Sequence, residues 1–112
     1  MRYKFINLTA HDISIETIEG TLLIPMSGII ATIVHGLRAP NDHWMRDTGI
    51  AVSDITKSTI MGMADLDDFG TTQQIVSAEV LAHIPKNTRV DYLSPGVHHM
   101  VGNIMHVQTF IR

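Results

Sequence analysis

Cysteine is absent from the 112-residue chain, and its absence excludes several kinds of chemistry. Without thiols there are no disulfide bonds, no thiolate nucleophile, and no cysteine-ligated zinc or iron–sulfur site. Aromatic residues make up only 5% of the chain, so aliphatic side chains and seven methionines supply most of the apolar mass. A small domain with few aromatic residues buries little surface, which favours stabilisation by homo-oligomerisation.

An excess of one charge and long apolar runs are also missing. Eight basic and eleven acidic residues give a formal net charge of −3. They are scattered singly, so no basic stripe can follow a phosphate backbone, and we expect no nucleic-acid partner. No apolar run approaches the roughly 20 residues that span a bilayer, and the first residues are too polar for a secretion signal. These absences predict a soluble, cytoplasmic protein with no membrane partner.

The composition predicts one packed domain spanning residues 1–112, since 45% of the residues are hydrophobic. Apolar and polar residues alternate: Ile13 and Ile15 fall on one face of a strand, with polar residues between them. Turn residues separate such segments and predict an antiparallel meander in the first third of the chain, ending in a buried strand. The predicted strands are residues 3–8, 13–18, 21–24, 29–35, 49–53, 57–63, 90–93, 97–101 and 104–110.

One helix is predicted over residues 73–84. Thr71 and Gln74 have the spacing of a capping box, and apolar residues recur every four positions from Val76 to Ile84. The two-residue break after residue 101 predicts a hairpin near the C-terminus. The predicted fold class is therefore α+β: a mostly antiparallel, twisted sheet or open barrel with one helix.

A long polar loop is predicted over residues 36–48, and it carries the groups that a nucleotide-like ligand needs. Trp44 offers a flat stacking surface, and Arg38 and Arg46 offer bidentate forks for phosphate. In the alternative interpretation, Trp44 anchors the loop and the arginines pair with neighbouring aspartates. The predicted ligand-binding set is Arg38, Trp44, Arg46, Arg89 and His99.

Seven histidines suggest a metal site as an alternative. His98 and His99 are adjacent and point to opposite faces of a strand, but His106 can oppose one of them across the hairpin. A carboxylate from residues 65–68 would complete a site for a metal-dependent hydrolase. The spacing matches no established ligand pattern, and Ser77 lacks the turn of a catalytic serine. We therefore predict no catalytic residue, no metal and no cofactor.

Three segments are distinctive when their order and spacing along the chain are considered together. They are residues 5–13, which include Asn7-Leu8-Thr9-Ala10-His11, residues 74–77, which include Ile75-Val76-Ser77, and residues 90–96, which end in Pro95-Gly96. With these segments the chain resembles a group of small phage and bacterial proteins that open with an Asn-Leu-Thr-Pro-His signature, although Ala10 replaces their proline. The resemblance covers about half of the chain and leaves out residues 36–70. Within the first segment, we expect the Asn7 side chain and the His11 ring to fix a turn by local hydrogen bonds.

The resemblance and an analogy with phage signal-sequestering proteins imply a leading function. Such sponges are non-catalytic homo-oligomers that capture a nucleotide-derived immune signal, of the cyclic nucleotide or cyclic ADP-ribose type, in the host-cell cytoplasm. A second hypothesis is an anti-CRISPR-like inhibitor that binds a host defence enzyme and imitates nucleic-acid phosphates with its acidic residues 65–68. The metal-dependent hydrolase is the third.

Overall fold

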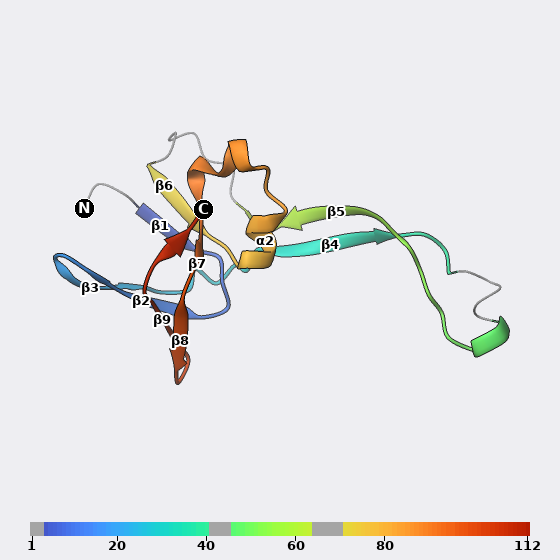
Figure 1. The fold of residues 1–112 in the computed structure, drawn as a ribbon, viewed down its shortest axis with the longest axis horizontal. Coiled ribbons are helices and arrows are strands. Elements are labelled where there is room, and N and C mark those ends of the chain that lie inside the picture. The colour runs from blue at the N-terminus through green and yellow to red at the C-terminus, as the bar shows by residue number, and fades with distance from the viewer. Residues whose placement is uncertain (1–3, 41–45, 64–70) are drawn as a thin grey trace.

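A computed structural model describes residues 4–40, 46–63 and 71–112 of the chain and shows an α+β fold, as predicted (Figure 1). Its strands are β1 (Lys4–Asn7), β2 (Asp12–Thr17), β3 (Gly20–Ile24), β4 (Thr32–Leu37), β5 (Ile55–Met61), β6 (Thr72–Ile75), β7 (Tyr92–Pro95), β8 (His98–Val101), β9 (Ile104–Val107) and β10 (Phe110–Ile111). The helix α2 (Ala78–Ala82) and the 3-10 helix η1 (Lys86–Asp91) lie between β6 and β7. Within the described residues, no helix is both long and apolar enough to cross a lipid bilayer.

The strands form two four-stranded sheets and a separate two-stranded ribbon. The first sheet has the order β1-β6-β7-β10 and the second the order β3-β2-β9-β8, whereas β4 pairs with β5 alone among the described strands. Four of the described strand pairs are antiparallel and three are parallel. The described sheets are therefore mixed and do not close into a barrel.

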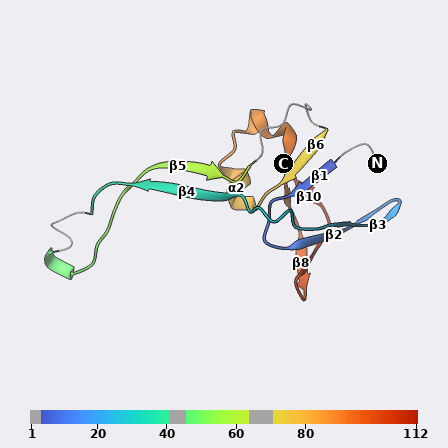
Figure 2. The same ribbon diagram turned by 180° about the vertical axis from the view of Figure 1, so that it is seen from behind.

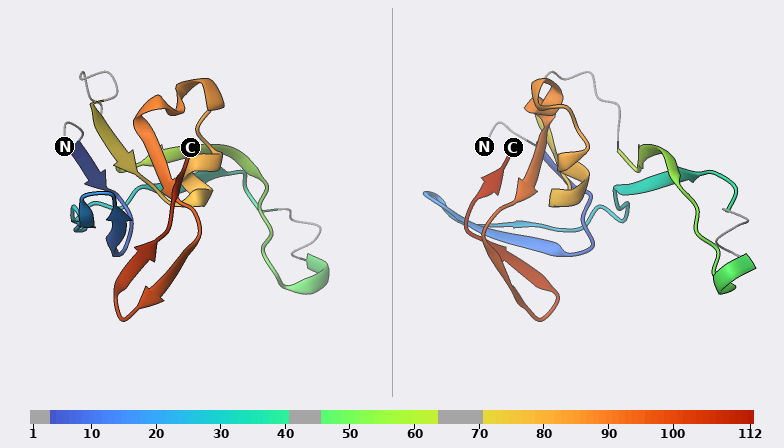
Figure 3. Two further views of the ribbon diagram at one scale, coloured as in Figure 1. Left: turned by 60° about the vertical axis from the view of Figure 1, so that its left-hand side comes forward. Right: turned by 45° about the vertical axis from the view of Figure 1, so that its right-hand side comes forward.

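The first sheet forms the middle layer, and its two faces are covered by different elements. Val76 follows β6 and packs with Val80 and Leu81 of α2. Ile75, its neighbour, packs instead with Ile13 of β2 and Val107 of β9. Because adjacent residues of an extended chain point to opposite faces, β6 is buried between α2 and the second sheet. Figure 3 shows α2 against the first sheet, next to the base of the ribbon.

The predicted antiparallel meander is wrong in most of its pairings. Only β2 and β3 form the expected hairpin, with Ile13 opposite Ile24. β1 runs parallel to β6, and the predicted buried strand over residues 29–35 is the largely exposed β4, which leaves the body of the protein. Alternation identifies a strand but not its partner, because pairing at long range depends on which surfaces the packed core brings together.

The predicted helix over residues 73–84 is correct only in its second half. Thr72–Ile75 is the central strand β6, so the predicted capping box is wrong. The helix begins after Ser77, whose side chain accepts a hydrogen bond from the backbone N–H of Val80 at 3.3 Å. A strand buried on both faces and a helix with one buried stripe both place apolar residues four positions apart, so periodicity did not separate them.

Three smaller boundaries also differ from the prediction. Residues 49–53 form no strand, and β5 begins at Ile55. The predicted strand at 90–93 begins two residues late because η1 occupies the preceding residues. The hairpin of β8 and β9 is confirmed, with Val101 opposite Ile104.

The ribbon of β4 and β5 projects far from the body (Figures 1 and 2). The chain measures 62 × 35 × 23 Å and has a radius of gyration of 18.0 Å, against about 13 Å for a compact domain of this length. Gly62 marks the junction, where its φ is 91°. A Cβ atom on this residue would lie 2.6 Å from the Ile30 carbonyl oxygen, so the junction has no room for a side chain.

Candidate functional site

The outer face of the second sheet carries a row of polar side chains. The register places Ser14 of β2 beside His106 of β9, and His106 opposite His99 of β8. Partners in register point to the same face of a sheet, so the three side chains lie side by side. Glu16 follows two residues after Ser14 and shares this face, as the sequence alternation predicted.

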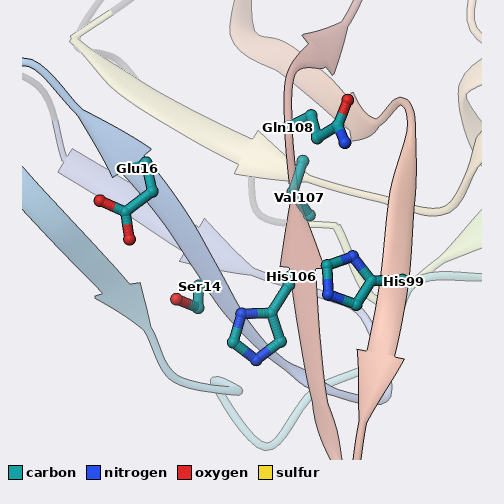
Figure 4. A pocket seen from close by; sticks show the side chains of 6 residues that line it. All are labelled: Ser14, Glu16, His99, His106, Val107 and Gln108. Atoms are coloured by element: carbon teal, nitrogen blue, oxygen red, sulfur yellow. The ribbon is translucent and has the colours of Figure 1, made fainter.

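The two imidazole rings of this row stack on each other. The ring centroids of His99 and His106 are 5.3 Å apart, and the ring planes differ by 14°. The tight turn at Gly102, which has a φ of 60°, closes the hairpin so that the two histidines become cross-strand partners. Figure 4 shows the pair beside Ser14 and Glu16.

A cavity of about 330 Å³ opens at this row. It is lined by Ser14, Glu16, His99, His106, Val107 and Gln108. The Glu16 carboxylate accepts a hydrogen bond from the Thr21 hydroxyl, which orients it. Within the described part of the chain, the Ser14 hydroxyl and the Gln108 amide have no hydrogen-bond partner. The cavity therefore offers a stacking surface, a carboxylate acceptor and an amide that both donates and accepts.

A second cavity, also of about 330 Å³, lies where the parallel strands β1, β6 and β7 end. Its lining is mainly apolar and comprises Leu8, Thr9, Ala10, His11, Ile30, Ala31, Ser77, Pro95, His98 and Met105. All three segments singled out in the sequence analysis contribute to it, through residues 8–11, Ser77 and Pro95. The Ser77 hydroxyl already caps α2, and Nδ1 of His98 lies 2.7 Å from the Gly96 carbonyl oxygen. The second cavity therefore has fewer polar groups available to a ligand than the first cavity.

The turn after β1 is fixed by the Asn7 side chain, as expected. Asn7 is 1% exposed, and its amide donates to the carbonyl oxygens of His11 at 2.8 Å and Ile24 at 3.0 Å. Its Oδ1 accepts from both the backbone N–H and the hydroxyl of Thr9. The expectation for the His11 ring is wrong: His11 contributes its carbonyl, and the residue lines the second cavity instead.

The predicted ligand-binding residues lie in separate parts of the structure. Arg38 lies on the ribbon, where its backbone N–H bonds to the Asp54 carbonyl, and Arg46 belongs to a short helical turn beyond the strands. Nε of Arg89 donates to the Ile84 carbonyl at 2.8 Å, at the end of the α2 segment. Among these described residues, only His99 lines one of the two cavities.

Two predictions fall on residues outside the described ranges. These are the stacking surface of Trp44 and the acidic residues 65–68. Within the described ranges, no three or more histidine, aspartate or glutamate residues gather as metal ligands.

The sequence prediction missed Ser14, Glu16 and Gln108 as site residues. The sequence patterns that contain these residues are the alternation from residue 13 and the hairpin across Gly102, which lie near opposite ends of the chain. The parallel pairing of β2 with β9 joins these patterns, and a parallel pairing between segments near opposite ends of the chain leaves no local sequence signal.

The fold and the site define a small α+β domain with a histidine-lined depression on an open sheet. No protein-family model, curated protein or solved structure matches the chain.

Proposed function

We propose that this protein is a non-catalytic, phage-associated binding protein that sequesters a nucleotide-derived signal by holding its base in the first cavity. The observation that supports this most strongly is the stacked pair of His99 and His106 with Glu16 and Gln108 around the same cavity. The resemblance of the three sequence segments to small phage proteins supports the association with phages.

The lining suits a planar heterocycle. Stacking of a base on an aromatic side chain is worth about 1–3 kcal/mol per base, and the outer face of the histidine pair offers such a surface. The Glu16 carboxylate accepts hydrogen bonds from ring and exocyclic N–H groups of a base, whereas the Gln108 amide both donates and accepts. A purine edge presents these complementary groups within the reach of a cavity of this size.

Among the described residues that line the cavity, none is lysine or arginine, and Glu16 is the one acidic residue. Phosphate groups therefore gain nothing from these residues, and we expect them to face solvent. Recognition through the base predicts that affinity depends only weakly on salt, because few counterions are released when phosphates are not contacted.

Calorimetric titration tests the proposal with a panel of cyclic di- and trinucleotides and cyclic ADP-ribose isomers. We expect saturable binding of at least one compound, and the His99→Ala variant should lose about tenfold or more in affinity, consistent with one stacking contact. Substrate turnover, followed in the same mixtures by chromatography, should be absent.

His98→Ala is the matched control, because His98 is the preceding residue of β8 and lines the other cavity. This variant should keep the wild-type affinity. Absence of binding across the whole panel, or equal affinities for the wild type and His99→Ala, would contradict the proposal.

A further inference from the structure

Among the described residues, the edge of β4 is open, and its one irregularity is a register shift between Gly36 and Leu37. β5 is its one hydrogen-bonded neighbour within these ranges. Its sequence, Thr-Ile-Val-His-Gly-Leu, contains neither a formally charged residue nor proline, and Val34 and Leu37 are 52% and 61% exposed. Monomeric proteins commonly protect such edges with lysine, proline or a covering element. The other strand, β5, does carry a lysine, Lys57.

The ribbon also has no layer to pack against in the part of the chain that the structure describes. At its base, Ile33 and Ile60 contact the hydrophobic core beneath α2. Beyond them, the described apolar side chains of the ribbon are exposed, including Leu37 and Ile55 at 61% and 60%. An isolated two-stranded ribbon is marginally stable in water, so a ribbon of this length needs a further strand or a covering surface.

We propose that a second copy of this chain extends the ribbon by pairing its β4 edge with the β4 edge of the first. The product is a four-stranded sheet in the order β5-β4-β4-β5, with a twofold axis between the two copies of β4. An antiparallel pair of identical strands satisfies twofold symmetry by construction, so each copy offers the same donors and acceptors to the other.

The charge distribution is compatible with a second copy as the occupant. β4 carries no formal charge, so two copies approach without like-charge repulsion. The described ribbon carries Arg38, Arg46 and Lys57 against Asp47 and Asp54, so one more basic than acidic residue, and it does not select a strongly charged partner.

The first test is the molar mass of the protein in solution, measured by light scattering over a dilution series. The wild type should have twice the mass of the 12.4 kDa chain. Val34→Lys should have the mass of one chain, because each copy then carries a charged lysine on the strand that pairs. Leu23→Lys, at a similarly exposed position of β3, should keep the doubled mass.

A wild type with the mass of one chain at every concentration would overturn the proposal, even if the ribbon then captured a strand of a foreign protein. A doubled mass in Val34→Lys would also overturn it, because the copies would then associate elsewhere. Circular dichroism and urea unfolding show whether each variant is folded.

The second test uses the natural lack of cysteine and does not depend on a destabilising charge. A Val34→Cys variant treated with a short bismaleimide should give a covalent dimer on a denaturing gel. Leu23→Cys should give none under the same conditions. Equal yields from the two variants, or no product from Val34→Cys, would contradict pairing at β4.

Discussion

The body and the ribbon of this protein use similar side chains with opposite results. In the body, Ile13 and Ile75 are completely buried between the two four-stranded sheets. On the ribbon, Val34, Leu37 and Ile55 are between 52% and 61% exposed. Both regions are β-rich and apolar, but of the two only the body has described sheets and a helix stacked in layers. The number of layers, and not the composition of a strand, decides whether its apolar side chains stabilise a single copy of the chain.

The comparison also separates two kinds of functional surface. The body presents its polar face outward at the histidine cavity, because its apolar face is already covered. Beyond its base, the ribbon has no face covered by a described element, so its exposed apolar positions are available to another chain. Recognition of a small molecule and association between copies are therefore assigned to different regions in our proposals.

The largest expected effect is the difference in unfolding free energy between two isoleucine-to-alanine variants, one in the body and one on the ribbon. Ile75→Ala should lower the free energy of unfolding by about 4 kcal/mol, because the side chain is fully buried and leaves a cavity. Ile50→Ala, at a position 59% exposed on the ribbon side, should change it by less than about 0.5 kcal/mol. Urea unfolding measures both, and equal losses would remove the distinction between the regions.

A smaller effect is expected at the turn that leads from β1 to β2. Asn7→Ala should lower the free energy of unfolding by about 2–3 kcal/mol, because it leaves buried carbonyl groups and the Thr9 donors without their partner. His11→Ala keeps the carbonyl that Asn7 uses and should cost less than about 1 kcal/mol. Urea unfolding measures both losses. A larger loss for His11→Ala than for Asn7→Ala would show that the imidazole ring, and not the Asn7 side chain, stabilises the turn.

The smallest loss of stability is expected at Ser77, where the chain passes from β6 to α2. Ser77→Ala should cost about 1 kcal/mol, because it removes the cap on the Val80 N–H. Ser77→Thr keeps the capping oxygen and should restore most of the loss. Thermal unfolding measures both variants, and identical midpoints for the two would show that the cap does not contribute.

The sequence predicted the local features of the body well. The alternation after Ile13 identified the polar outer face on which Glu16 lies, and the turn at Gly102 identified the hairpin that opposes His106 to His99. These features depend on residues within a few positions of each other. The alternation of apolar and polar residues, or a pair of turn residues, therefore indicates them directly.

The errors lie where distant segments meet. β6 was predicted as helix because Val76 and Val80 have helical spacing, although Val76 follows a strand covered on both faces. The strand over residues 29–35 was predicted to be buried because it is apolar, and it became the exposed β4 because neither four-stranded sheet lies against it. Neither outcome depends on the composition of the segment itself.

Local conformational preferences and composition are enough to account for the alternating strands, the turn at Gly102 and the lack of thiol groups in the chain. Packing between distant segments places β2 parallel to β9, which brings Ser14 and Glu16 to the histidine pair, and leaves the ribbon of β4 and β5 away from the core. Those arrangements are set by the burial of apolar faces against partners far along the chain, and this burial energy belongs to pairs of segments rather than to any one of them.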